Sequence, residues 1–394
     1  MAKDKYLSVR DSVSGFSFAN LGLFTGFADG IYNAVYSLVL LEIFRSSAIV
    51  GIYVSVYAAF CMIVGLFANE LFRLFSKVKV FYFSMLFLGL CYLMMSFSIK
   101  PSTFIILDYV TGIAVTLVGV LIPLFMSDFS NHIGMSKLNS RYHLWLNVGA
   151  LIAPLIAVNI ANAFDNRSAF FAAGIIYIAG WLFFKYFKIV QENKQIKQVN
   201  PRRTIKSLWR NTLGFFSKSV FVRAYIINFS YYALRAMRYL YVPIVVIEAG
   251  FSKDVLGWVL AIGIIPYLIM TELMSSLVKK FGKKFWLVVG FSSFAMFSSF
   301  AIFTNGYLLL AIFIAWQFSG AVMESVHDLL FFDNTKKAEQ TKYYGIFRTS
   351  VNLPNVLVPI MAAGCITAFG TTSAVWITTA VIGFMAVLIL MMKK

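Results

Sequence analysis

The chain has 394 residues, of which 60% are hydrophobic and only 13% are charged. Water-soluble globular proteins carry about one-quarter charged residues, so this composition argues against a soluble class. The formal net charge is +18, which would suit a nucleic-acid-binding protein. The basic residues stand in short loops between apolar runs, however. Orientation in a membrane explains that distribution better, and no nucleic-acid partner is expected.

The three cysteines each lie inside an apolar run and provide neither a disulfide framework nor the spacing of a metal site. The first apolar run is of spanning length and no small-residue cleavage site follows it, so no cleavable signal peptide is expected. No phosphate-binding glycine-rich loop and no Ser/His/Asp set stands out. We therefore expect no cofactor, no metal and no enzymatic activity.

About 20 largely apolar residues suffice for a helix to cross the hydrocarbon core of a bilayer. Runs of this length predict twelve transmembrane helices, and their continuous rather than alternating pattern argues against a β-barrel. The first six predicted helices cover roughly 16–42, 48–72, 79–98, 102–127, 141–163 and 168–188. The other six cover roughly 219–247, 255–277, 284–304, 307–331, 343–367 and 371–392.

The longest polar interval, residues 189–217, is basic and contains Pro201. It is predicted to be a cytoplasmic linker between an N-terminal six-helix bundle, residues 1–188, and a C-terminal one, residues 218–394. Lysine and arginine are frequent in the loops on the linker's side and rare in those on the other side, which places both termini in the cytoplasm. We expect a monomeric, multi-pass protein of the plasma (inner) membrane.

The second half of the chain repeats the first at a nearly fixed offset. The run Leu71-Phe72-Arg73-Leu74-Phe75-Ser76-Lys77 matches, 206 positions later, Leu277-Val278-Lys279-Lys280-Phe281-Gly282-Lys283. A second set matches at an offset of 205: Asp128, Lys137, Asn147 and Pro154 correspond to Asp333, Lys342, Asn352 and Pro359. Two matches at nearly one offset favour duplication of a six-helix unit, and parallel repeats of this kind are a transporter architecture.

This layout resembles the major facilitator superfamily over the whole chain. The stretch Ser275-Ser276-Leu277-Val278-Lys279-Lys280-Phe281-Gly282-Lys283-Lys284 is similar to that family's G-x-L-a-D-r-x-G-r-k loop motif, and Asn69 to Lys79 is a weaker copy. Both depart from it: the first glycine is Ser275 or Asn69 here, and the aspartate is Lys279 or Arg73. The resemblance implies two pseudo-symmetric six-helix bundles, a first and a seventh helix that face each other across a central cavity, and secondary transport.

Ionisable side chains within a membrane span are costly, so they usually line a cavity. Asp29 lies about half-way along the first span, and the 206-residue offset carries it onto Arg235 in the seventh span, with Arg238 one turn further. The resemblance implies that these groups meet at similar depth, where they would bind substrate; a static salt bridge is the alternative. Other residues expected to bind substrate are Tyr32, Tyr36, Asn147, Tyr231, Gln317 and Asn352.

The tenth span carries Glu324, His327 and Asp328 at a spacing that predicts one shared helical face. A carboxylate beside an imidazole can pass a proton near neutral pH. Glu324 and His327, together with Asp29, are therefore predicted to couple transport to protons. The spacing is similar to acid–histidine pairs of proton-coupled sugar symporters in the resembled family, in reversed order. The alternative is that this group only anchors the cytoplasmic end of the helix.

Charged residues at the inner ends of spans are expected to clasp the two halves when the inner side is closed, although such groups more often extend to the interface. They are Asp128, His143, Asp333 and Arg348. Asp108, about two turns from the outer end of its span, is expected to line an outer vestibule.

These features predict a secondary active transporter that moves a small organic solute by alternating access, coupled to protons. The two arginines favour an anionic or zwitterionic solute that is taken up by symport. Proton-antiport efflux of an amphipathic drug or lipid is the alternative, since an acid in the first span and an aromatic cavity also serve cations. A non-transporting receptor or scaffold derived from a transporter is a second alternative, because the loop motif departs from the family pattern.

Overall fold

The computed structural model describes residues 15–129, 135–187, 201–324, 326–327, 330–331, 334–335 and 337–391. Helices make up nearly all of these ranges, which contain no strand. Eleven helices among them are long and apolar enough to cross a membrane. The predicted class, an all-α polytopic membrane protein, is therefore confirmed.

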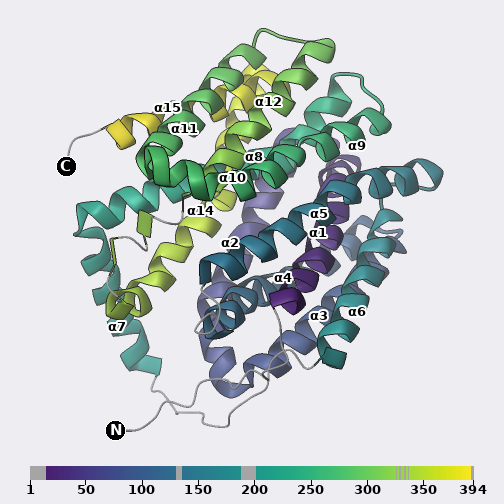
Figure 1. The fold of residues 1–394 in the computed structure, drawn as a ribbon. Coiled ribbons are helices and arrows are strands. Elements are labelled where there is room, and N and C mark those ends of the chain that lie inside the picture. The colour runs from purple at the N-terminus through teal and green to yellow at the C-terminus, as the bar shows by residue number, and fades with distance from the viewer. Residues whose placement is uncertain are drawn as a thin grey trace, which may run out of the picture. The chain divides into compact units, whose positions relative to one another are not determined.

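Continuous apolar runs fold as helices because backbone groups inside a bilayer must be hydrogen-bonded within their own segment. Before the polar interval the helices are α1 (Gly15–Phe44), α2 (Ser47–Leu74), α3 (Lys77–Ser96), α4 (Pro101–Phe129), α5 (Met135–Ala163) and α6 (Ala169–Phe187). After it come α7 (Pro201–Phe216), α8 (Ser219–Glu248), α9 (Lys253–Ile262), α10 (Ile265–Phe281), α11 (Lys283–Ala301), α12 (Gly306–Glu324), α14 (Lys337–Phe369) and α15 (Thr371–Met391). Figure 1 colours and labels them in chain order.

Helix α8 corresponds to the predicted seventh span, although its mean hydropathy is too low for it to count among the eleven helices. Its 30 residues are long enough to cross a bilayer. Asn228, Arg235 and Arg238 lie in its interior and lower its mean hydropathy. Because polar groups inside a span usually serve a function, α8 is the helix on which a site is most expected.

Packing divides the chain into two compact units. Unit 1 comprises Met1–Val39, Phe60–Gln198 and Lys253–Ile264. Unit 2 comprises Leu40–Ala59, Val199–Ser252 and Ile265–Lys394. The end of α1 and the first part of α2 therefore belong to unit 2, and α9 belongs to unit 1. Of the predicted linker 189–217, the part before residue 201 lies outside the described residues, and most of the remainder forms α7.

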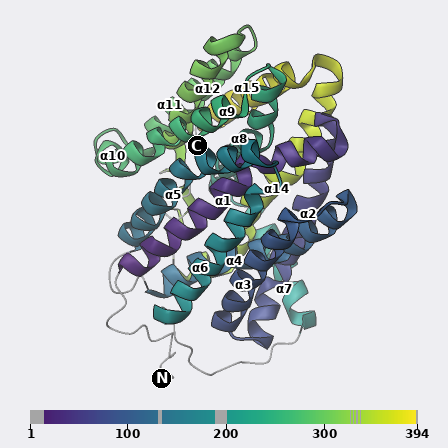
Figure 2. The same cartoon turned by 90° about the vertical axis from the view of Figure 1, so that its right-hand side faces the viewer.

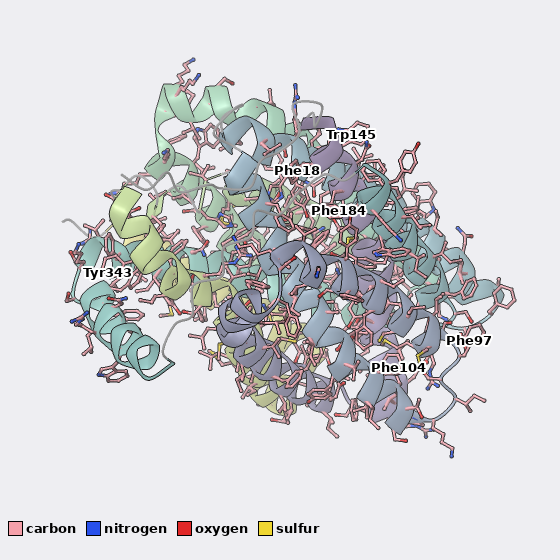
Figure 3. The ribbon with its side chains drawn as sticks, turned by 90° about the horizontal axis from the view of Figure 1, so that it is seen from below. Phe18, Phe97, Phe104, Trp145, Phe184 and Tyr343 are labelled. Atoms are coloured by element: carbon pink, nitrogen blue, oxygen red, sulfur yellow. The ribbon has the colours of Figure 1, made fainter. Side chains whose placement is uncertain are left out.

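In unit 1, α3 packs along α6 and α4, side by side in Figures 1 and 2, and α5 packs against α9. Phe184 of α6 is fully buried, with its ring centroid 4.6 Å from that of Phe81 and 6.2 Å from that of Phe125. Figure 3 shows Phe184 among the helices and the exposed Phe97 at the end of α3. Large aromatic side chains thus fill the interior of this unit.

In unit 2, α11 packs along α15 and α12, and α14 packs along α8. Trp316 on α12 and Trp376 on α15 are both fully enclosed, and their ring centroids lie 5.7 Å apart in an edge-to-face arrangement. Nε1 of Trp316 donates a hydrogen bond of 3.0 Å to Oγ of Ser298 on α11. The polar edge of the Trp316 indole is therefore paired, as is usual for a buried tryptophan, whereas Nε1 of Trp376 has no hydrogen-bond partner.

Helices α1 and α5 cross at close range through small residues. Gly22, Gly26 and Gly30 recur at four-residue intervals on α1, and each faces α5. A Cβ atom on Gly149 of α5 would lie 2.6 Å from the backbone nitrogen of Phe27 on α1. The crossing therefore leaves no room for a side chain, as in other small-residue helix contacts within membranes.

The predicted span 255–277 corresponds to one of the eleven candidate spans, Lys253–Thr271, but its helix is interrupted and consists of two helices. Helix α9 ends at Ile262 and α10 begins at Ile265. Proline has no backbone N–H to donate, so Pro266 suits the first turn of a new helix better than the middle of a long one. At the break, the N–H groups of Gly263 and Ile264 still bond, at 3.0 Å each, to the carbonyls of Val259 and Ala261.

The predicted span 307–331 is also too long, since α12 ends at Glu324. His327 lies in a turn, where its N–H and that of Val326 both bond the carbonyl of Met323 at 3.0 Å. The prediction that Glu324 and His327 share a face of one continuous helix is therefore wrong. The sequence that follows Glu324 contains serine and aspartate, which compete for backbone hydrogen bonds and disfavour helix. Asp328 lies outside the described residues.

Candidate functional site

Two arginines of α8 form the centre of a cluster in unit 2. Arg238 is 5% exposed, and its guanidinium carbon lies 4.8 Å from the ring centroid of Tyr267 on α10 and 5.1 Å from that of Tyr239. The guanidinium carbon of Arg235 lies 5.4 Å from the centroid of Tyr239 and 5.9 Å from that of Tyr232. Aromatic faces stabilise a cation without neutralising it. Among the described side chains, no carboxylate forms an ion pair with either arginine.

A small cavity lies beside these arginines, between α8, α10 and α12. Its lining includes Tyr231, Arg235, Arg238, Tyr267, Gln317 and Gly320. Its free volume is about 10 Å³, which is room for about one water molecule. In this conformation the unit 2 site is therefore closed around its donors and holds nothing larger.

Two buried donors beside this cavity have no hydrogen-bond partner. They are Nε of Arg238 and Nε2 of Gln317, whose side chain is 1% exposed. The hydroxyl of Tyr267 donates to Oε1 of Gln317 at 3.5 Å, which leaves the amide nitrogen as the open end of that side chain. Buried donors are nearly always paired, and leaving one unpaired costs free energy. The two donors can therefore each bond an acceptor placed in the adjacent cavity.

Tyr231 joins this cluster to a carboxylate and an imidazole. Its hydroxyl donates to Oε1 of Glu324 at 3.3 Å. Its ring meets the buried ring of His327 edge-on with 3.9 Å between centroids, and His327 also stacks on Tyr232 at 5.4 Å. Glu324 and His327 are thus brought together around one tyrosine, although the continuous helix expected to align them ends between them.

Unit 1 holds a second cluster, in which tyrosines donate to two carboxylates. Asp108 of α4 is fully buried and accepts hydrogen bonds from Tyr32 at 3.1 Å and from Tyr36 at 2.7 Å, both on α1. Asp29 of α1 accepts a hydrogen bond from the hydroxyl of Tyr177 on α6. The expected vestibule position of Asp108 is therefore wrong, because two tyrosines one turn apart on α1 cover it.

Contacts between tyrosine rings connect the two carboxylates of unit 1. The ring of Tyr92 on α3 lies 5.1 Å from that of Tyr32 and 5.7 Å from that of Tyr177, measured between centroids. Neither Tyr92 nor Tyr177 was expected from the sequence, and in unit 2 Tyr267 was missed as well. The chain has 20 tyrosines, so residue type alone could not single out these three. Only their tertiary neighbours distinguish them.

The other predicted site residues lie on α4, α5 and α14. Asn147 on α5 is 4% exposed, and its Nδ2 has no hydrogen-bond partner. His143 on α5 and both Asn352 and Arg348 on α14 are half-buried. Asp128 falls in α4, but its side chain, like the whole of Asp333, lies outside the described part of the chain. The roles assigned to these residues stay predictions.

The two clusters are suited to different chemistry. The unit 2 cluster offers two guanidinium groups and an amide N–H to an anion, and such charge-assisted hydrogen bonds are strong. The unit 1 cluster offers carboxylates that can hold or release a proton against tyrosine hydroxyls. Across the described residues, no group of three His, Cys, Asp or Glu side chains is placed to hold a metal ion.

Comparisons with known proteins identify a family and similar solved structures. The profile of a family described as the Major Facilitator Superfamily matches residues 18–252 and 224–394. The solved structure of a D-xylose-proton symporter superimposes with a TM-score of 0.76 at 18% sequence identity, covering 96% of each chain. The nucleoside transporter NupG superimposes with a TM-score of 0.72 at 11% identity, covering 96% of this chain and 99% of that one. At such identities the likeness is one of fold. No curated protein matches the sequence.

Proposed function

Because the chain belongs to the Major Facilitator Superfamily, a family of membrane transporters, we propose that it is a secondary transporter of a small organic anion or zwitterion. Its predicted family fold is confirmed by the same match and by its structural neighbours. In the proposal, substrate binds at the arginine cluster of unit 2, and protons couple to transport through carboxylates of both units. Binding and release alternate between the two faces of the membrane.

One observation carries the proposal: Arg238 is buried with no carboxylate partner among the described side chains and with its Nε unpaired. A buried charge is strongly disfavoured unless it is paired. Cation–π contacts with Tyr239 and Tyr267 compensate only part of that penalty. A substrate oxyanion would supply the missing charge and the missing acceptor together, which is how a site favours its ligand over water.

The surroundings of the arginines support a substrate with a ring. Tyr231, Tyr267 and Trp316 line the same cavity, and Gln317 adds a neutral donor. Aromatic faces with hydrogen-bonding edges suit ring-shaped polar molecules. The names of two structural neighbours give a sugar and nucleosides as their own substrates. We propose a ring-bearing solute that also carries a carboxylate or phosphate group.

The test begins with thermal unfolding of the purified full chain in the presence of sugars, sugar acids, nucleosides, nucleoside monophosphates and cationic dyes. Compounds that raise the unfolding midpoint then enter transport assays in proteoliposomes, with and without a pH gradient. We expect the anions to raise the midpoint and to accumulate when the gradient drives protons in the same direction. A lipophilic cation carried against the proton, with no anion transported, would establish the efflux alternative instead.

Glu324 is the proposed proton carrier of unit 2, because its carboxylate faces Tyr231 and that ring contacts His327. In the variant Glu324→Gln, we expect proton-driven accumulation of substrate to fall by about 100-fold, the lower end of the range in which a lost proton-transfer group acts. Exchange of labelled for unlabelled substrate, which needs no net proton movement, should persist. The measurement compares the two assays in the same proteoliposomes.

Glu248→Gln serves as the matched control, since Glu248 is an exposed carboxylate at the end of α8. It should leave both assays unchanged. If Glu324→Gln accumulates substrate as the unchanged protein does, Glu324 carries no coupling proton, and Asp29 becomes the carboxylate to substitute next.

A further inference from the structure

Helix α7 is fixed at its C-terminal end by aromatic packing against the ends of two spans. Phe215 is fully buried, and its ring centroid lies 5.3 Å from that of Phe221 on α8 and 5.9 Å from that of Tyr343 on α14. Figure 3 shows Tyr343 beside this helix. The apolar window of α14 begins at Ile346, just beyond Tyr343, and α8 begins at Ser219. The end of α7 is therefore held at the level where these two spans begin.

One side of α7 is apolar and exposed. Trp209, Leu213 and Phe216 have 68%, 56% and 45% of their surface exposed. Their positions differ by four and three residues, so they lie on one face of the helix. Phe215 points to a different face, which packs on the protein. Tryptophan, leucine and phenylalanine together on one exposed helix face are typical of helices that lie at a membrane interface.

The same helix is strongly basic. Its sequence contains Arg202, Arg203, Lys206 and Arg210 and no acidic residue. At 100° per residue, positions 203, 206 and 210 lie to one side of the face formed by 209, 213 and 216, whereas position 202 continues that face towards the start of the helix. An apolar stripe bordered by basic residues is the pattern of helices that lie on a membrane surface.

We infer that α7 is a lipid-binding anchor, whose aromatic stripe enters the membrane interface while its basic residues bind the headgroups of anionic phospholipids. Charge complementarity selects this occupant, because four cations and no anion stand on the helix. A protein partner would have to reach a helix end that packs at the membrane boundary. Polybasic segments next to a span are attracted to anionic lipids by their surface potential.

The experiment uses the full chain in nanodiscs made from phosphatidylcholine with an increasing fraction of phosphatidylglycerol. Lipids with brominated tails quench tryptophan that reaches the membrane, and the difference between the unchanged protein and Trp209→Phe isolates the signal of Trp209. We expect Trp209 to be quenched, and more strongly when the brominated lipid is phosphatidylglycerol. Absence of quenching at Trp209 would mean that this face does not enter the membrane, and it would overturn the inference.

Headgroup selection is tested with Arg202→Gln, Arg203→Gln, Lys206→Gln and Arg210→Gln combined. We expect this variant to lose about tenfold or more of its preference for phosphatidylglycerol over phosphatidylcholine near α7. The matched control neutralises four basic residues between α10 and α11, Lys279, Lys280, Lys283 and Lys284, which changes the net charge equally. If both variants lose the same preference, the effect is one of net charge and the inference fails. The single variant Arg210→Gln, at an exposed position, applies if the combined variant does not fold.

Discussion

Replacing Arg238 by glutamine is expected to weaken substrate binding by about 10- to 150-fold, the range that corresponds to loss of one charge-assisted hydrogen bond. Glutamine keeps a donor but removes the charge that an oxyanion would pair with. The substrate-free protein should remain folded with an equal or higher unfolding midpoint, because the buried guanidinium has an unpaired Nε and no described carboxylate depends on it. Ligand titration and thermal unfolding of the same preparation measure both effects.

If Arg238 instead had only a structural role, its replacement would lower stability and leave substrate binding unchanged. Removing one partner of a buried ion pair usually lowers stability by about 3–5 kcal/mol, which thermal unfolding would reveal even without substrate. Arg223→Gln is the matched control, since Arg223 lies near the start of the same helix and outside the cluster around Arg238. Unchanged binding in the Arg238 variant would rule out the proposed site, whatever happens to stability.

Replacing Gly26 by alanine is expected to destabilise the protein by about 3 kcal/mol or more, at the upper end of what overpacking costs. The added Cβ atom would clash with the backbone of Leu146 on α5. The backbone cannot relieve such a clash by changing rotamer, as a flexible side chain can. The two helices must then separate, which also forfeits the contacts of Gly22 and Gly30. The midpoint of thermal unfolding, or the yield of folded protein where unfolding is irreversible, measures the effect.

Gly119→Ala serves as a control, because the expected change in stability is zero or of opposite sign. A Cβ atom on Gly119 of α4 would have no neighbour within 4 Å, and alanine forms helix better than glycine. This variant should be as stable as the unchanged protein or slightly more so. If Gly26→Ala unfolds at the same midpoint as Gly119→Ala, the close crossing of α1 and α5 does not hold in solution.

The approximate positions of most spans could be predicted because eleven of them are local runs of apolar residues, whereas α8 is long enough to span but less apolar. The two interruptions could not be predicted in the same way. The apolar stretch that covers α9 and the start of α10 is continuous through Gly263, and apolar residues at 329–332 follow Glu324 in the sequence. Helix ends inside a membrane depend on which carbonyls find alternative donors, and that is settled by packing.

The residues of the site also divide into those that the sequence indicates and those that it does not. Helical spacing on α8 places Tyr231 and Tyr239 near Arg235, so a part of the cluster follows from sequence alone. Gln317 on α12 was also among the residues expected to bind substrate, although no local pattern connects it to α8. Tyr267 on α10 was missed, because the signal that marks it is tertiary contact, which one sequence does not carry.

The interruption at Gly263 and Ile264 has a mechanical consequence. A continuous helix resists bending because its whole ladder of backbone hydrogen bonds must strain, whereas here the ladder is interrupted at two peptide units that keep their bonds to Val259 and Ala261. Helix α10 begins directly after this interruption and brings Tyr267 onto Arg238. If α10 rotated there, the ring of Tyr267 would leave the guanidinium and uncover its unpaired Nε. In the proposed function, a ligand that reached this Nε would therefore have to displace the ring of Tyr267.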